Sequence, residues 1–452
     1  MMRHGAIVVF AAGFGSLFAT YWDDAWHTDI GRDDAFIAPH LLLYGAVALA
    51  GLVVAAWGLV AMWRARSVFA LLRNSALTTA AAGGAVTLAA GVADAWWHAE
   101  FGRDAVLWSP PHMLAVFGST ALIVGVLGES RLRTVGGALV LGSALISVLE
   151  FETGVPQFSE TLYLPVLLLS ALFATAVIRR LVPGRHPVAR VVGVYLVARV
   201  LITVVLMVLG RSTPDLPLAI VGLAAADLPW RRSVTAYAAG AAGVSVTAVL
   251  SSALGLTSVP VSGLLPTAAA VAVLFLLSLA RLPRMAAAAL VLGAITLAPL
   301  QGADRAEAHD PGQGEPVAKV TLTGTSDGRG TLTLAADLPG DCSACAIVAR
   351  RAGSTLTGTV TVSGTRATGT VRVPPGGIWF AYLQTRTAET WLPLDSGSAG
   401  TVTRVRELYL PAGRAEGAGL PPLEVAAGIL LYAAGFAVLA LAIRQVRRPA
   451  TV

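Results

Sequence analysis

Long runs of apolar residues separated by short polar segments dominate this chain. Windows of about 19 residues with high hydropathy are typical of membrane-spanning helices. Twelve such stretches occur, at 5–24, 36–63, 76–97, 109–128, 134–149, 161–178, 189–209, 214–229, 234–254, 264–280, 284–300 and 422–443. The pattern therefore predicts an all-α polytopic membrane protein with about 12 transmembrane helices.

The region from about 302 to 420 follows a different pattern. Polar and apolar residues alternate in runs such as VAKVTLTGT and GTLTLAADL, and turn signals such as SDGRG and PPGG separate the runs. This period of two is typical of β-strands, and about seven to nine strands fit. We expect an inserted all-β sandwich domain, which the last span ties back to the membrane. The expected organisation is 1–70 (first helical hairpin), 71–130 (second hairpin), 131–301 (further helices), 302–420 (β domain) and 421–452 (C-terminal anchor).

Composition and charge agree with a membrane location. The 452 residues are 56% hydrophobic, and their mean hydropathy is +0.72. The formal net charge is +6 at pH 7, and arginines cluster at every second membrane boundary, for example Arg64, Arg66, Arg131, Arg133, Arg179, Arg180, Arg231, Arg232, Arg444 and Arg447. Short loops rich in arginine and lysine stay on the cytoplasmic side of the membrane. Both termini are therefore expected on the cytoplasmic side of the plasma membrane, and the β domain is expected to be extracytoplasmic. The basic residues do not gather on one soluble face, and nucleic-acid binding is not expected.

Two stretches repeat the same polar residues in the same order. One reads DDAWHTDIGRDDAFIAPH from Asp23, and the other reads DAWWHAEFGRDAVLWSPPH from Asp94. Asp23 and His27 are four residues apart, as are Asp94 and His98, so each pair shares one helix face. The Asp, the first His and the Arg-Asp pair recur after 71 residues, and the last histidine recurs after 72. The pattern indicates an internal repeat of two helical hairpins.

Each hairpin carries one carboxylate and two imidazoles. The predicted ligand sets are Asp23, His27 and His40 in the first hairpin, and Asp94, His98 and His112 in the second. Such a set suits copper(II), zinc or non-haem iron. We interpret the neighbouring Arg-Asp pairs as groups that order the loop and orient the histidines: Arg32, Asp33, Arg103 and Asp104. A structural network of ion pairs without a metal is the alternative.

The motif Asp-x-x-Trp-His, four residues, Arg-Asp, then Phe, Pro and His resembles the metal-binding hairpin of the C subunit of the particulate methane and ammonia monooxygenases. In that family the Asp and both His bind copper. The resemblance implies copper at Asp23, His27 and His40, and at the matching positions of the second copy, whose loop has one extra residue. It covers about 18 residues in each copy, and the tandem arrangement departs from the family.

The β domain carries weaker candidates. His309 follows a leader-like apolar segment, at the place where periplasmic copper-binding β-sandwich proteins, including the B subunit of the same monooxygenases, begin with a histidine. That likeness implies a second metal site. Cys342 and Cys345 form a Cys-x-x-Cys pair, which fits a disulfide, a soft-metal site or a redox pair.

These patterns favour a membrane protein that binds copper at the outer face for its acquisition, storage or transfer, with zinc and iron as alternative metals. The competing hypothesis is a copper-dependent, monooxygenase-like enzyme that acts with partner subunits. A redox-sensing or structural protein without metal is the third. The sequence does not decide whether the chain is an enzyme. The lipid bilayer and a metal ion are the expected partners. The sequence is also compatible with an oligomer and with partner copper proteins.

Overall fold

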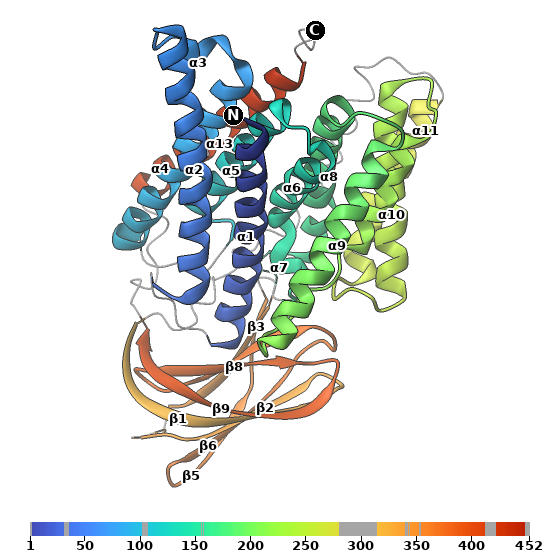
Figure 1. Ribbon diagram of the computed structural model, residues 1–452. Helices are drawn as coiled ribbons and strands as arrows, with labels where there is room; N and C mark the ends of the chain where they lie inside the picture. Colours follow the sequence, from blue (N-terminus) through green and yellow to red (C-terminus); the bar gives the residue numbers. More distant parts are fainter. Residues whose placement is uncertain are drawn as a thin grey trace.

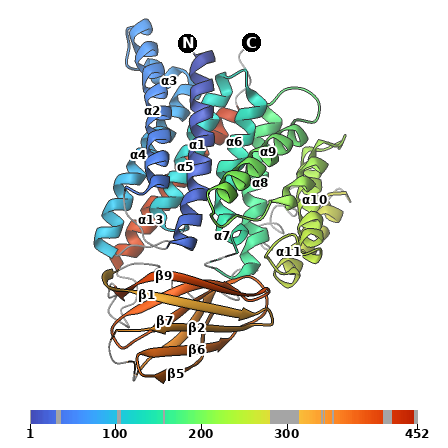
Figure 2. The same ribbon diagram turned by 60° about the horizontal axis from the view of Figure 1, so that its bottom comes forward.

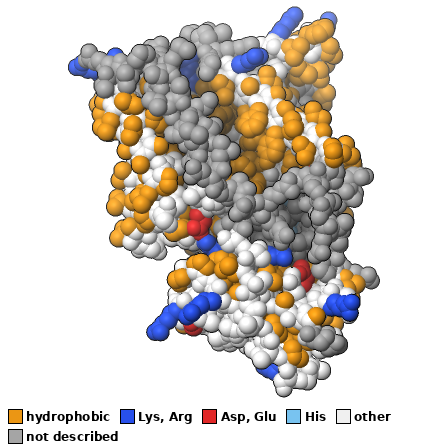
Figure 3. All heavy atoms as spheres, turned by 180° about the vertical axis from the view of Figure 1, so that it is seen from behind, with side chains coloured by type: hydrophobic (Ala, Val, Ile, Leu, Met, Phe, Trp, Pro, Cys, Tyr) orange, Lys and Arg blue, Asp and Glu red, His pale blue; other side chains and the backbone are white. Residues whose placement is uncertain are grey.

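The computed structural model describes residues 2–30, 36–101, 107–154, 156, 158–279, 314–339, 342, 344–351, 354–411 and 422–447. A bundle of long helices stands on a curved β-sheet (Figure 1). Ten helical segments within these residues are long and apolar enough to cross a membrane. Hydrophobic side chains cover the flank of the bundle (Figure 3), which is how a multi-pass membrane protein meets lipid.

Within the described residues, fourteen helical segments precede the sheet and one follows it. The long helices are α1 (Met2–Asp29), α2 (Ala38–Ala65), α4 (Ser75–Phe101), α5 (Pro110–Glu129), α6 (Arg133–Leu145), α8 (Tyr163–Leu181), α9 (Pro187–Val208), α10 (Ser233–Ala253), α11 (Val261–Leu279) and α13 (Pro422–Arg447). The short segments are α3 (Ala70–Arg73), η1 (Ile146–Val148), α7 (Leu149–Glu152), η2 (Glu160–Leu162) and η3 (Leu218–Asp227). Through η1, α6 continues into α7, so that Arg133–Glu152 forms one span.

One predicted span differs from an ordinary α-helix. The stretch predicted at 214–229 contains the ten-residue 3₁₀ helix η3. At about 2.0 Å of rise per residue, η3 is about 20 Å long. The backbone N–H of Asp215 donates to Glu152 O (2.6 Å), and the Asp227 carboxylate accepts from the Ala189 N–H (2.9 Å). The segment therefore runs from one end of the bundle to the other with fewer residues than an α-helix needs. The span predicted at 284–300 lies outside the described residues.

Small residues bring α4 and α5 into backbone contact. A Cβ atom on Gly83 would lie 2.4 Å from Leu122 N, and one on Gly125 would lie 2.4 Å from Ala80 N. Because lipid is as apolar as the helix surfaces, close van der Waals packing of this kind is a main source of helix association in membranes.

The β domain forms one nine-stranded antiparallel sheet in the order β4-β3-β7-β8-β9-β1-β2-β6-β5. Its strands are β1 (Gly314–Asp327), β2 (Thr331–Asp337), β3 (Ala346–Arg351), β4 (Ser354–Thr357), β5 (Thr359–Ser363), β6 (Arg366–Arg372), β7 (Ile378–Gln384), β8 (Glu389–Asp395) and β9 (Ala399–Pro411). The sheet curls until it is nearly closed (Figure 2), so Ile347 of β3 contacts Gly369 of β6 across the interior. The predicted all-β domain is confirmed.

The sheet packs against the end of the bundle at which α1 ends. Phe380, Tyr382, Trp391 and Tyr409 form a buried aromatic cluster, and the neighbouring Ile378 lies beside Gly154 of the helical part. The start of α1 and the end of α13 thus lie at one end of the bundle, and the sheet lies at the other (Figure 1). Which side is cytoplasmic stays a prediction.

Candidate metal centre

The last turns of α1 place two of the predicted ligands. Asp23 and His27 lie one turn apart on the same face, and His27 Nε2 is 3.6 Å from Asp23 Oδ1. Their side chains are 24% and 18% exposed, which leaves them mostly covered but open to an ion from the end of the bundle. The helical spacing alone therefore places two of the three ligands.

The first turn of α2 supplies the third ligand. Ile37 caps the helix in an extended conformation, and Pro39 lies in the first turn. Proline is tolerated there because backbone N–H groups in the first turn have no acceptor within the helix. His40 is the third residue of α2, and Tyr44 lies one turn further with its ring centroid 5.8 Å from that of His40. The helix start thus points one imidazole back toward α1.

Asp23, His27 and His40 form a compact triad. One ligand atom from each lies within 4.8 Å of the other two, and His40 Nε2 is 3.1 Å from Asp23 Oδ1. Bonds of about 2.0–2.1 Å in tetrahedral geometry separate ligand atoms by about 3.3 Å. At 3.1 Å, His40 can hydrogen-bond to the Asp23 carboxylate when no ion is bound. The three ligand atoms therefore lie close enough together to share one metal ion.

The second motif reproduces part of this arrangement. His112 is the third residue of α5, as His40 is of α2, and its Nε2 lies 3.1 Å from Asp94 Oδ1. His98 belongs to α4, but its side chain lies outside what the structure describes. The second predicted ligand set is therefore described for Asp94 and His112 only. His112 lies close enough to Asp23 for an electrostatic interaction, so the two motifs face a common region.

Contacts with other segments fix the end of α1. The Asp29 carboxylate accepts hydrogen bonds from the backbone N–H (2.8 Å) and the hydroxyl of Ser212, and the Arg211 guanidinium lies 5.1 Å from the Trp26 ring centroid. From the β domain, Arg406 donates to the Ile30 carbonyl. Burial lowers the pKa of Arg406 to about 10, although the negative charge of Asp29 opposes this shift. Arg406 thus stays protonated at neutral pH.

A cavity of about 60 Å³ lies deeper in the bundle, between the two hairpins. Its lining is mostly apolar but includes the hydroxyls of Ser16, Thr87 and Ser119. Each of these residues is seven positions from a predicted ligand on the same helix, which corresponds to about 10 Å. The two motifs therefore lie at about the same distance from this cavity.

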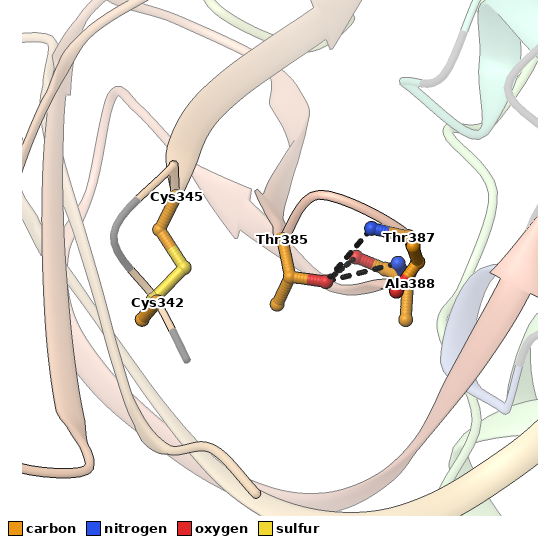
Figure 4. The surroundings of a disulfide bond; sticks show 5 residues. All are labelled: Cys342, Cys345, Thr385, Thr387 and Ala388. Carbon is orange, nitrogen blue, oxygen red and sulfur yellow. Dashed lines mark hydrogen bonds between the residues drawn. A yellow bond between two sulfur atoms is a disulfide. The ribbon is translucent and has the colours of Figure 1, made fainter. Parts of the chain in front are cut away.

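Several predicted residues are not part of the triad. The Arg-Asp pairs Arg32-Asp33 and Arg103-Asp104 and the candidate His309 lie outside the described residues. Cys342 and Cys345 are joined by a disulfide (Figure 4). Of the three alternatives for this pair, the structure shows the disulfide, which leaves no free thiolate to bind copper(I).

Sequence reasoning missed a buried polar cluster beside α1. Arg199 of α9 is 0% exposed and pairs with Glu152 at 2.6 Å. Tyr21 and Tyr195 also contact the guanidinium, at 2.6 and 3.2 Å. Glu150 and Glu152 are both buried. A lone arginine inside an apolar span was the available signal.

Comparisons of the chain with protein-family models, with curated proteins and with solved structures found no match.

Proposed function

We propose that this chain is a membrane copper-binding protein that holds copper through Asp23, His27 and His40. The convergence of three ligand atoms within 4.8 Å of one another is the observation that supports it most strongly. One carboxylate and two imidazoles suit copper(II). Zinc or iron(II) can bind the same donors, but with lower affinity than copper(II).

The position of the triad supports a role in copper acquisition, storage or transfer. It lies at the end of the bundle that faces the β domain, which the arginine pattern assigns to the outer side of the membrane. Three protein ligands leave coordination positions open, and an incoming copper carrier can use them to exchange the ion. In this proposal Asp94 and His112 contribute a second copper site with His98.

The cavity between the hairpins favours one alternative function. A mostly apolar space of about 60 Å³ beneath both motifs could admit a small substrate, as a copper-dependent, monooxygenase-like enzyme requires. Oxygen uptake by the copper-loaded protein, supplied with a reductant and small apolar substrates, separates the two functions. Uptake that depends on the substrate supports the enzyme, and copper exchange without uptake supports copper handling.

Copper(II) titration of the metal-free chain tests the triad itself. His40→Ala removes one ligand and should weaken copper binding by at least about 100-fold, since loss of even an outer-shell partner typically costs 10–100-fold. His4→Ala is the matched control, because His4 is exposed near the far end of α1. Equal affinities for the wild type and both variants would refute the proposal.

A further inference from the structure

The buried ion pair between Arg199 and Glu152 leaves one carboxylate oxygen unused. Arg199 donates to Glu152 Oε2 (2.6 Å), and the Tyr21 hydroxyl contacts the same oxygen (3.2 Å). Glu152 is only 3% exposed, and its other oxygen, Oε1, has no hydrogen-bond partner among the described residues. An unpartnered buried carboxylate oxygen is costly, so it calls for a ligand.

Glu152 borders a small cavity that is rich in oxygen atoms. The cavity measures about 10 Å³, which is room for a single water-sized occupant. Its polar lining residues are Glu152, Tyr163, Asp215, Ser251 and Thr257. All five offer oxygen donors and none offers nitrogen or sulfur, so the lining suits a hard cation rather than copper.

The charges around this cavity do not balance. Arg199 neutralises one carboxylate, that of Glu152, and its second contact is to the backbone carbonyl of Asp215 (2.9 Å). The Asp215 carboxylate accepts instead from a neutral donor, the backbone N–H of Ser258 (2.6 Å). The region therefore carries excess negative charge at a depth where uncompensated charge is expensive.

The backbone strengthens this preference for a cation. α7 ends at Glu152, and α10 ends at Ala253, two residues after Ser251, so the negative ends of two helix dipoles lie at the cavity. The chain from Arg211 to Pro217 is neither helix nor strand, and its residues Asp215 and Leu216 line the cavity. Non-helical backbone at membrane depth is tolerated where it lines a cavity, and broken helices of this kind often hold ions.

We propose that this cavity binds one small monovalent metal cation of the size of sodium. Glu152 Oε1 and the Asp215 carboxylate are the charged ligands, and the hydroxyls of Ser251 and Thr257 are the neutral ones. The site is separate from the triad at Asp23, and it gives the chain a requirement for sodium that does not depend on copper.

Thermal unfolding of the full-length protein in detergent, with a chelator present to remove copper, tests this site. Melting is compared in sodium, potassium and choline chloride at equal ionic strength, so that charge screening is the same. We expect the Tm in sodium to exceed that in choline by about 2 °C or more, because a ligand that binds only the folded state stabilises it. Potassium should give a smaller rise, because the cavity is small.

Two variants localise the effect. Asp215→Asn and Ser251→Ala should each reduce or abolish the sodium-dependent rise, whereas Ser245→Ala should keep it. Ser245 and Ser251 are both buried in α10, but only Ser251 lines the cavity. Because Ser251→Ala leaves the Arg199–Glu152 pair intact, it decides the question even where Asp215→Asn fails to fold.

Equal melting of the wild type in sodium and choline would overturn the proposal and would assign the cavity to water or to a proton on one of the carboxyls. An undiminished sodium effect in Ser251→Ala would also overturn it. We expect the same sodium-dependent rise in Tm in His27→Ala as in the wild type. This result would show that the sodium site does not depend on the proposed copper site.

Discussion

Arg199 illustrates how a single buried side chain constrains the bundle. Its guanidinium contacts Glu152, Tyr21, Tyr195 and the Asp215 backbone, and its charge lies 4.1 Å from the Tyr21 ring centroid. Because these partners come from four separate segments, the arginine joins α1, α7 and α9 to the chain that leads into η3. The same contacts hold α1 in the position that presents Asp23.

Arg199→Met should lower the free energy of unfolding by about 3–5 kcal/mol, because it leaves the Glu152 charge buried without a partner. The double variant Arg199→Met with Glu152→Leu should recover much of that loss, since it removes both charges. Denaturant titrations in mixed micelles measure both. A double variant less stable than the single one would contradict this account of the ion pair.

At the residue scale the sequence predicts the triad but not the ion pair. The spacing from Asp23 to His27 requires only a helix, and His40 follows a proline that starts the next helix. The partner of Arg199 is different, because Glu152 lies 47 positions away and its choice depends on how α7 and α9 pack. No local pattern carries that information.

The helices α4 and α5 depend on glycine at their contact. A Cβ atom on Gly83 would approach Leu122 N at 2.4 Å and Gly118 O at 2.6 Å, and neither backbone atom can move without shifting α5. α4 carries Asp94 and α5 carries His112. The close approach therefore sets the geometry of the second motif.

Gly83→Ala should separate α4 from α5 and lower the free energy of unfolding by about 1–3 kcal/mol, the usual range for overpacking. Gly91→Ala is the matched control, because Gly91 lies on the same helix and a Cβ atom there has nothing within 4 Å. Equal losses of stability, measured by denaturant titration of both variants, would argue against backbone contact at Gly83.

The disulfide in the β domain gives a second prediction at the scale of elements. Cys342→Ser with Cys345→Ser should leave the copper content unchanged, because the two sulfur atoms are bonded to each other. The same variant should lower the stability of the β domain by about 2 kcal/mol, as expected for a short closed loop. Loss of a copper equivalent in the double variant would instead assign a metal to the cysteines.

Hydropathy and strand periodicity predict most elements, and they fail where tertiary contacts decide. η3 is the clearest example, since Gly222 packs against Gly243 of α10 and a Cβ atom on it would lie 2.1 Å from that backbone. This contact favours a thin, tightly wound segment that apolar composition alone cannot distinguish from an α-helix. Likewise, alternation predicts the strands but not that β3 meets β6 across a nearly closed sheet.

In the whole molecule the β domain covers the end of the bundle that carries the triad. Arg406 reaches Ile30 next to the end of α1, and Arg351 pairs with Glu160 of η2. These contacts join positions as far as 376 residues apart, so the sequence alone does not predict them. We therefore expect the domain to restrict access to the triad.

Arg406→Ala should loosen this cover and speed the removal of copper by a soluble chelator severalfold. Arg404→Ala is the control, because Arg404 lies on the same strand and is exposed. Stopped-flow or manual mixing with the chelator gives both rates. Identical rates for Arg406→Ala and the wild type would show that the β domain does not limit access.

Elemental analysis of the purified chain tests the central claim, that Asp23, His27 and His40 hold a copper ion. Wild type, His27→Ala, His40→Ala and the control His4→Ala are purified side by side and their metal content per chain is measured. The account predicts that each triad variant loses one copper equivalent and that His4→Ala matches the wild type. Unchanged copper in His27→Ala and His40→Ala, or no bound metal in the wild type, would contradict it.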